Sequence, residues 1–299
     1  MPPLPRIEIP LEGPAQVHPT NPNLLRLYDW HLSLCDAGGC ALGTATVQAM
    51  PLSNQLERSG LSFAPAFHHY FGHPPELQLP PLRLRYTCAF ENGYRGPVEL
   101  VLEPGSIVGE WAIRVNSSAS LGPGNLRPTA AHVRGSLGVE ISSLLRPGAN
   151  TIEVEVATAR PDGGLVNALY LAGDLGVRLH PVRLVERTGA GSFEDYAANG
   201  LPYYAGVVEY RKRFTLEHLP DGPRYLAYLS TTEPFQEACE VSINGGAYEP
   251  VLWEPRCLTV EAGQLRVEEN ELSVRVYTSL SRAFEGQWFD HRAHEHRDP

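Results

Sequence analysis

Long apolar runs, a leader-like amino terminus and paired cysteines are all missing from this 299-residue sequence. It contains no stretch of about 18 apolar residues, which excludes a membrane-spanning helix. Residues 1–10 hold neither a basic segment nor an apolar segment of a signal peptide, so we expect a cytoplasmic protein. The five cysteines form no Cys-x-x-Cys pair, and an odd number in so large a chain argues against a disulfide framework. Cys35 and Cys40 flank a Gly-Gly turn, and reduced thiols are the simpler interpretation of this pair.

Excess positive charge and nucleotide-binding motifs are absent too. The formal net charge is −10, with 24 Lys and Arg against 34 Asp and Glu. So acidic a chain has no electrostatic attraction for a phosphate backbone or an anionic membrane, and we expect neither nucleic acid nor membrane as a partner. The sequence holds no phosphate-binding glycine loop, no Gly-x-Ser-x-Gly and no His-Glu-x-x-His. We therefore predict that no cofactor is bound.

One segment does bring imidazoles and a carboxylate close together. Residues 68–76 include His69, His73 and Glu76, whose side chains are of the type that ligates transition metals. Spacing alone is weak evidence, and the Pro-Pro pair in this segment favours a rigid surface loop. We predict no metal site.

Helical periodicity is almost absent, and short alternating runs take its place. The 28 glycines and 27 prolines follow no period, which is typical of many strands joined by turns. In residues 151–156, Ile152, Val154 and Val156 face one way and the polar residues between them face water. Similar runs occur at residues 82–86, 98–102, 111–115, 208–211, 225–229, 239–243 and 272–277. The pattern predicts an all-β protein.

The runs of the two halves follow the same order. Each half has a tyrosine-containing strand, a Gly-Pro strand opening, an apolar strand that ends in Asn, and a second Asn before the last alternating strand. The corresponding residues are Tyr86, Asn116 and Asn150 in one half, and Tyr210, Asn244 and Asn270 in the other. We interpret this order as a divergent duplication of one sandwich. The polar stretch at residues 182–191 marks the boundary, so we predict one sandwich in residues 1–188 and another in residues 189–299. Residues 20–80 supply opening strands, with Trp30 inward, and a long surface loop.

The second half carries a more specific pattern. Residues 200–214 read Gly-Leu-Pro-Tyr-Tyr-Ala-Gly-Val-Val-Glu-Tyr-Arg-Lys-Arg-Phe, and Val-Ser-Ile-Asn-Gly and Trp-Glu-Pro follow at 241–245 and 253–255. These segments resemble galactose-binding-like jelly rolls that accompany glycoside hydrolases of the α-L-rhamnosidase and family two β-galactosidase groups. The resemblance covers about two thirds of the chain and specifies the fold better than the ligand, because this fold serves many functions. It implies two tandem jelly-roll sandwiches without the catalytic barrel. One departure is Ser117, which follows Asn116 where the pattern has glycine.

The resemblance implies a carbohydrate ligand, contacted by Tyr203, Tyr204, Asn244 and Trp253. Exposed aromatic rings stack on the apolar faces of pyranose rings, and tyrosine hydroxyls reach sugar hydroxyls. The alternative for these aromatic residues is a place in the core or at an interface.

We therefore expect a non-catalytic carbohydrate-binding or accessory module pair, whose partner is a glycan or a glycoside hydrolase catalytic domain. Two alternatives stay open, namely a structural protein that docks a partner chain and a hydrolase in its own right. A hydrolase needs two carboxyl groups at a defined separation, one of them usually with a raised pKa. Acidic residues here mostly occupy outward strand positions, as do Glu99, Glu153, Glu155, Glu209 and Glu240. The sequence leaves the oligomeric state open.

Overall fold

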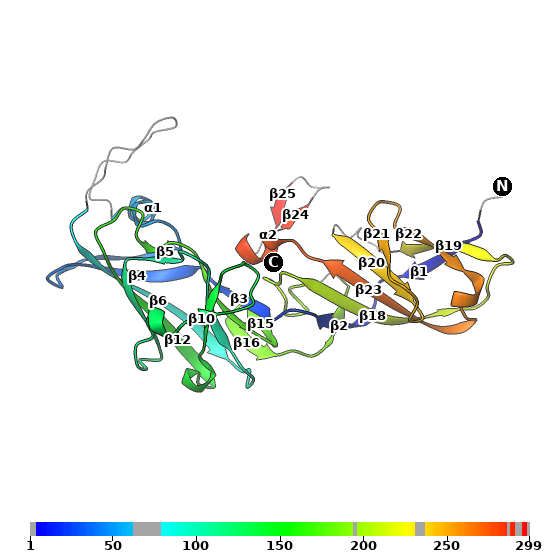
Figure 1. The fold of residues 1–299 in the computed structure, drawn as a ribbon, viewed down its shortest axis with the longest axis horizontal. Helices are drawn as coiled ribbons and strands as arrows, with labels where there is room; N and C mark the ends of the chain where they lie inside the picture. Colours follow the sequence, from blue (N-terminus) through cyan, green and yellow to red (C-terminus); the bar gives the residue numbers. More distant parts are fainter. Residues whose placement is uncertain are drawn as a thin grey trace, which may run out of the picture. The chain divides into compact units, whose positions relative to one another are not determined.

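The protein is built almost entirely from β-strands, as the sequence predicts (Figure 1). A computed structural model describes residues 4–61, 79–193, 196–230, 237–285, 288–290 and 295–297. The histidine-containing segment 68–76 lies outside the described residues. The helices are α1 (Leu52–Ser59) and α2 (Leu280–Glu285), with short 3-10 turns at Pro123–Asn125, Ser142–Leu144 and Ala262–Gln264. Within the described ranges, no helix has the length and hydropathy needed to cross a bilayer.

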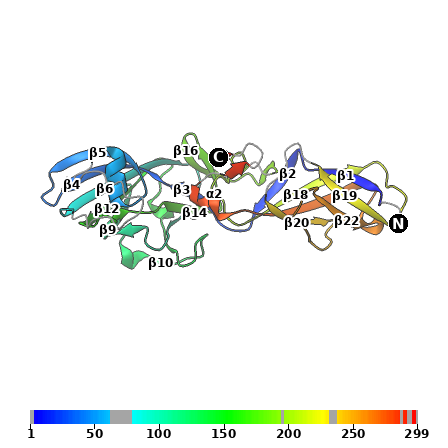
Figure 2. The ribbon, with the colours of Figure 1, turned by 90° about the horizontal axis from the view of Figure 1, so that it is seen from above.

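The chain divides into two compact units. The central unit comprises residues 24–186, and the terminal unit comprises residues 1–23 together with 187–299. The boundary near residue 187 lies close to the one expected from the sequence, but the amino-terminal residues belong to the other unit. Strand β1 (Arg6–Pro10) pairs in parallel with β19 (Arg224–Ser230), beside which it lies in Figure 2. Strand β2 (Pro14–Pro19) pairs with β18 (Val207–Leu216), so both ends of the chain contribute to the terminal unit.

The terminal unit consists of two sheets around one core. The larger sheet has the order β17 (Ala190–Ser192), β2, β18, β23 (Glu268–Tyr277), β20 (Ala238–Ile243) and β21 (Glu249–Val251). The smaller has the order β1, β19 and β22 (Cys257–Glu261), and β24 (Trp288–Asp290) pairs separately with β25 (Glu295–Arg297). Alternation along each strand turns one face inward: Val208, Tyr210 and Phe214 of β18 all join the buried core. The arrangement is that of a β-sandwich.

The central unit is a second sandwich-like body. One sheet has the order β15 (Leu175–Leu179), β16 (Val182–Glu186), β6 (Leu82–Asn92), β12 (Gly148–Thr158) and β9 (Glu110–Val115), and β4 (Asp29–Asp36) joins β6 and carries β5 (Ala41–Gln48). The other has the order β10 (Arg127–Pro128), β11 (Leu137–Glu140), β7 (Glu99–Leu102), β14 (Leu169–Gly173) and β3 (Asn23–Leu27). A two-stranded ladder joins β8 (Ile107–Val108) to β13 (Gly164–Leu165). Trp30 is buried with Leu32 and Leu34, as their alternation predicts.

The expected linker between the two units has a different structure. The stretch at residues 182–191 is mostly strand, since β16 pairs with β15 and β17 pairs with β2, and residues 187–189 between them hydrogen-bond to Val17 of β2. The register of β4 against β5 places Cys35 opposite Ala41. Cys40 lies just before β5, and both thiols are free.

Candidate functional site

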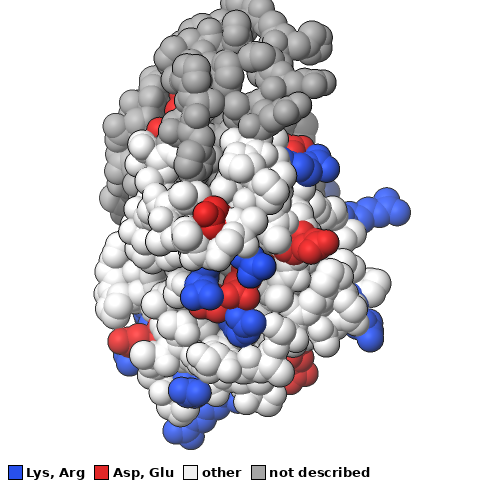
Figure 3. All heavy atoms as spheres, turned by 90° about the vertical axis from the view of Figure 1, so that its left-hand side faces the viewer, with Lys and Arg blue, Asp and Glu red and all other residues white. Residues whose placement is uncertain are grey.

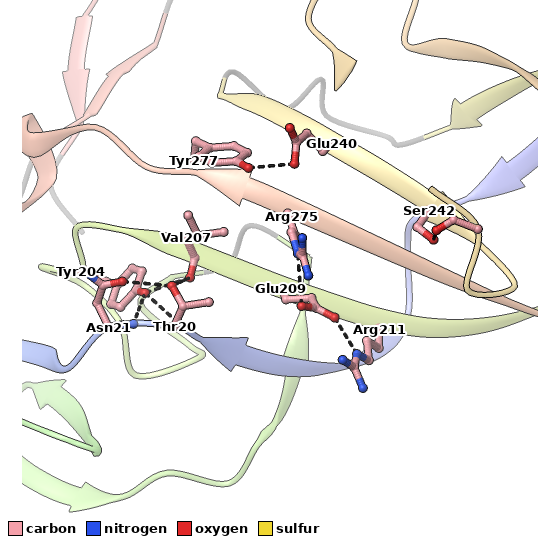
Figure 4. A network of polar contacts seen from close by, with 11 residues as sticks. Thr20, Asn21, Tyr204, Val207, Glu209, Arg211, Glu240, Ser242, Arg275 and Tyr277 are labelled. Atoms are coloured by element: carbon pink, nitrogen blue, oxygen red, sulfur yellow. Dashed lines mark hydrogen bonds and ion pairs between the residues drawn. The ribbon is translucent and has the colours of Figure 1, made fainter. Parts of the chain in front are cut away.

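Tyr204 is a core residue of the terminal unit. Its side chain is fully buried. The phenol oxygen accepts hydrogen bonds from the backbone N–H groups of Thr20 and Asn21, both at 3.0 Å, and donates one to the Val207 carbonyl at 2.8 Å (Figure 4). Burial raises the pKa of this phenol. Gly206 has φ +150°, and a Cβ there would lie 2.9 Å from the Tyr204 hydroxyl, which explains the glycine in this motif. Tyr204 therefore ties β2 to β18 and offers no surface to a ligand, whereas its neighbour Tyr203 is half-buried.

Asn244 closes a turn. It has the left-handed φ of 52°, which asparagine tolerates better than most residues. Its Nδ2 donates to the Gln264 carbonyl at 2.7 Å and to Asn270 Oδ1 at 2.8 Å, and its Oδ1 accepts from the Glu271 N–H at 2.8 Å. Buried Asn270 in turn bonds the backbone of Arg266 in both directions. The polar atoms of Asn244 thus hold the β20 turn to the start of β23.

Asn116 makes the same contacts in the central unit. Its Nδ2 donates to the Leu144 carbonyl at 2.9 Å and to Asn150 Oδ1 at 2.7 Å, its Oδ1 accepts from the Thr151 N–H at 3.0 Å, and its φ is 50°. Asn150 bonds the Arg146 backbone as Asn270 bonds that of Arg266. The two asparagine pairs singled out in the sequence therefore form two equivalent networks, in which the side chains bind backbone groups and each other.

Trp253, unlike Tyr204 and Asn244, lies on the surface with its side chain in solvent. The indole is 80% exposed, and Leu252 before it is 47% exposed. Both lie on the loop that connects β21 of the larger sheet to β22 of the smaller sheet. The exposure contradicts a core position for this tryptophan. It leaves the ring available for contact with a ligand.

Arg256 braces the Trp253 loop. Its guanidinium is buried, donates to the Val251 carbonyl at 2.7 Å and bonds the Glu254 carboxylate at 3.2 Å. The Leu229 N–H donates to the Arg256 carbonyl at 2.8 Å, which joins the loop to β19. The peptide between Glu254 and Pro255 is cis. Residues on both sides of Trp253 are thus fixed while the ring itself stands in solvent. Sequence reasoning missed Arg256, because an arginine three residues after a tryptophan carries no recognisable signal.

An exposed tyrosine and a carboxylate lie at the same end of the larger sheet. Tyr277 pairs with Ala238 and is 43% exposed, and its hydroxyl donates to the Glu240 carboxylate at 2.7 Å (Figure 4). That hydrogen bond is the main cause that raises the pKa of the Tyr277 phenol. On the next strand, Val251 pairs with Cys239, so the loop with Trp253 leaves the sheet at this same end. Tyr277 could have been found as the outward residue that ends the alternating run 272–277.

The outer face of the same sheet carries a partly buried ion-pair cluster of one glutamate and two arginines. Glu209, whose side chain is 9% exposed, accepts from Arg211 Nε at 2.6 Å and from Arg275 Nε at 3.3 Å. The Arg275 guanidinium also lies over the Tyr248 ring at 3.7 Å from its centroid. Burial acts to raise the pKa of Glu209, but the two arginines outweigh it and the pKa lies below its ordinary value. The cluster keeps Glu209 ionised.

The central unit has a comparable but exposed charge row. Glu155 on β12 pairs with Arg85 at 2.9 Å and with Arg114 at 3.0 Å, and Glu153 pairs with Arg114 at 3.2 Å. Burial acts to raise the pKa of Glu155, but the hydrogen bond from Arg85 and the charge of Arg114 bring it below its ordinary value. On the face that Figure 3 shows, acidic and basic side chains are intermixed and no large patch has one sign. The described residues contain no group of His, Cys, Asp and Glu that could hold a metal.

Comparison with known proteins gives distant matches. No family model and no curated protein matches the chain. Among solved structures it is similar to a GH2 β-galacturonidase from Eisenbergiella tayi (12% identity, 82% of this chain, 36% of that chain, TM-score 0.32). It is also similar to a β-glucuronidase from Ruminococcus gnavus (11% identity, 89% of this chain, 40% of that chain, TM-score 0.33). A third similar structure is a β-D-mannosidase from Dictyoglomus thermophilum (13% identity, 85% of this chain, 31% of that chain, TM-score 0.34). The chain thus spans 31 to 40% of the length of these three proteins. TM-scores this low carry no argument, so function has to be inferred from the residues themselves.

Proposed function

We propose that this chain is a non-catalytic carbohydrate-binding or accessory module pair of a glycoside hydrolase system, and that Trp253 is its principal sugar contact. The observation that carries the proposal is the 80% exposed indole on a loop whose neighbouring residues are fixed by Arg256. A large aromatic ring is normally buried, and when it is held in solvent its flat apolar face suits the apolar face of a pyranose. The motifs in residues 200–214 and 241–255, which resemble those of jelly-roll sugar-binding modules, support the same ligand class.

Polar groups at the same end of the larger sheet as the Trp253 loop suit sugar hydroxyls. The Glu240 carboxylate has acceptor capacity beyond its bond to Tyr277, and Tyr277 is itself partly exposed. One stacked ring with a few hydrogen bonds gives weak affinity, with a dissociation constant on the order of 0.1–10 mM. Of the four carbohydrate contacts expected from the sequence, we keep Trp253 as the principal contact and Tyr203 as a secondary one. Tyr204 and Asn244 serve the scaffold.

The proposed architecture is two divergent jelly-roll sandwiches. The equivalent networks around Asn116 and Asn244, each at the same point of its unit, support descent from one duplicated sandwich. The described carboxyl groups support a non-catalytic role. Among them, those of Glu155, Asp162 and Glu209 have pKa values that depart from the ordinary range, and all three are lowered, whereas a glycosidase acid needs a raised pKa.

Titration with mono- and oligosaccharides, read by indole fluorescence and calorimetry, tests the proposal. We expect weak saturable binding that Trp253→Ala abolishes with little change in melting temperature, because the side chain is mostly in solvent. Leu252→Ala is the matched control in the same loop and should retain binding, since it removes no ring. Absence of binding to every glycan class, or unchanged binding by Trp253→Ala, would refute the sugar-contact role.

The second candidate function is docking of a partner chain. The exposed Leu252 beside Trp253 favours it, because an aliphatic side chain adds nothing to sugar stacking but adds apolar area to a protein interface. In that case Leu252→Ala and Trp253→Ala should both weaken binding to a glycoside hydrolase catalytic domain supplied in trans, and neither should alter glycan titrations.

A further inference from the structure

Strand β5 is an edge strand of unusual composition. Edge strands carry free N–H and C=O groups, and proteins normally guard them with charges or proline. Among the sheets of the described residues, the edge strands of five or more residues are β1, β3, β5, β9, β15 and β22. All contain a charged residue except β5, whose sequence Ala-Leu-Gly-Thr-Ala-Thr-Val-Gln has neither charge nor proline. It is also the longest of the six, at 8 residues.

The ladder determines which groups of β5 face outward. Within the part of the chain that the structure describes, β5 pairs with β4 alone (Figure 1). The N–H of Ala49 donates to the Tyr28 carbonyl at 3.0 Å, which marks these opposed residues as a hydrogen-bonded pair. Such pairs alternate along an antiparallel ladder, so Ala45 and Val47 bond to β4. The backbone groups of Thr44 and Thr46 therefore point away from β4, and both threonine side chains are exposed.

The free stretch has defined ends. Helix α1 closes one of them, because Gln55 Nε2 donates to the Gln48 carbonyl at 3.1 Å and Arg58 donates to the Gln48 side chain at 3.3 Å. A register shift between Leu34 and Cys35 interrupts the ladder toward the hairpin turn at the other end. As far as the described residues show, Thr44 and Thr46 are left as the regular positions of β5 without a covering group.

We propose that this edge pairs with the same edge of a second copy of the chain, in an antiparallel arrangement centred on Ala45. A two-fold axis at Ala45 sets Thr44 opposite Thr46 of the partner, and the reverse, so that the outward groups of both residues are satisfied. Threonine pairs across strands are favourable, and no like charges meet. Helix α1, which closes one end of the strand, carries one charge of each sign, on exposed Glu57 and Arg58, and so has no net charge from its side chains.

The contact is small, so the association is weak. Edge pairing over so few residues falls in the low size class of interfaces, and we expect dimerisation at about 10–500 µM protein. The net charge of −10 on each copy opposes association at long range, whereas the paired strands are uncharged. Added salt should therefore strengthen the dimer, because it screens the repulsion beyond about 8 Å at 0.15 M.

Sedimentation equilibrium of the full chain tests the proposal, with Thr44→Lys/Thr46→Lys as the variant and Thr259→Lys as the control. Thr259 is an exposed threonine on edge strand β22, already guarded by Glu261. We expect the wild type and the control to pass from monomer to dimer as concentration rises, and the double variant to stay monomeric with an unchanged circular dichroism spectrum. A wild type that is monomeric up to 500 µM, or a folded double variant that still dimerises, would overturn the proposal.

A cysteine introduced at the axis gives a second readout that needs no charged variant. In Ala45→Cys the two thiols would face each other across a non-hydrogen-bonded pair, where Cα atoms are about 4.5 Å apart and a disulfide fits. Mild oxidation followed by peptide mass spectrometry should yield a cross-link between the two introduced cysteines, whereas a Thr259→Cys control should give none. A cross-link from the introduced thiol only to native cysteines, or dimers without any cross-link at this position, would overturn the Ala45-centred register.

Discussion

Replacing Asn244 with alanine separates a scaffold role from a ligand role at this position. The substitution removes three side-chain hydrogen bonds, to the Gln264 carbonyl, Asn270 and the Glu271 N–H. Each contributes about 1 kcal/mol net. Alanine at a φ of 52° adds about 1–2 kcal/mol of left-handed strain. Because Asn270 also loses a partner, we expect the free energy of unfolding of the terminal unit to fall by about 3–5 kcal/mol.

Urea unfolding with Asn116→Ala as the matched variant measures this loss. The two units should unfold in separate transitions, with Asn244→Ala moving one midpoint and Asn116→Ala moving the other by a similar amount, since both networks have the same bonds. With a slope of about 2 kcal/mol per molar urea, a loss of about 4 kcal/mol moves a midpoint by about 2 M. Asn244→Gly should cost about 1 kcal/mol less than alanine, because glycine adopts this φ without strain. A stable Asn244→Ala that has lost glycan binding would refute the reasoning and restore a ligand role.

Two further outcomes follow from the terminal unit. Tyr204→Phe removes the hydrogen bonds of the phenol oxygen to the Thr20 and Asn21 N–H groups and to the Val207 carbonyl, although Thr20 N–H still donates to the Val207 carbonyl at 2.9 Å. The melting temperature should therefore fall by an amount equivalent to about 1–3 kcal/mol while glycan affinity stays unchanged, and unaltered stability would count against the hydrogen bonds described. Because the folded pKa of Glu209 lies below its ordinary value, its contribution to stability is present above about pH 4.5 and is lost as pH falls through the folded pKa. The difference in unfolding free energy between wild type and Glu209→Gln should therefore shrink from about pH 6 to about pH 3, and a difference independent of pH would contradict this.

The strand segments were predictable because alternation is a local property. Residues 111–115 and 239–243 lie inside β9 and β20, since apolar residues at every second position can bury only one face of a pleated strand. Pairing was much less predictable. Nothing in residues 6–10 indicates that their partner is residues 226–230, because the contact joins segments more than 200 positions apart. This is why the amino-terminal strands were expected in the wrong half of the chain.

The sequence identified the residues of interest in the candidate site, but it did not predict the role of each one. The tyrosine pair, the asparagine and the tryptophan were all recognisable as motif residues, but burial decides what each one does. Tyr204 links backbone segments because three backbone groups converge on its hydroxyl, and Trp253 is a surface residue on a loop that buried Arg256 holds by hydrogen bonds. Such convergence depends on the three-dimensional arrangement of distant backbone groups, which spacing along the chain does not encode.

The assembly of the terminal unit from both ends of the chain has a consequence during synthesis. Residues 24–186 form a compact unit from one continuous segment, so all the strands of that unit are synthesised before the terminal unit is complete. Strands β1 and β2 leave the ribosome well before their partners, because β18 and β19 begin only at residues 207 and 224. At about 5–20 residues per second the first strands wait on the order of 10–40 s without a partner. Arg6, Glu8 and the prolines of these two strands are residues of the kind that disfavours pairing with other chains during this interval.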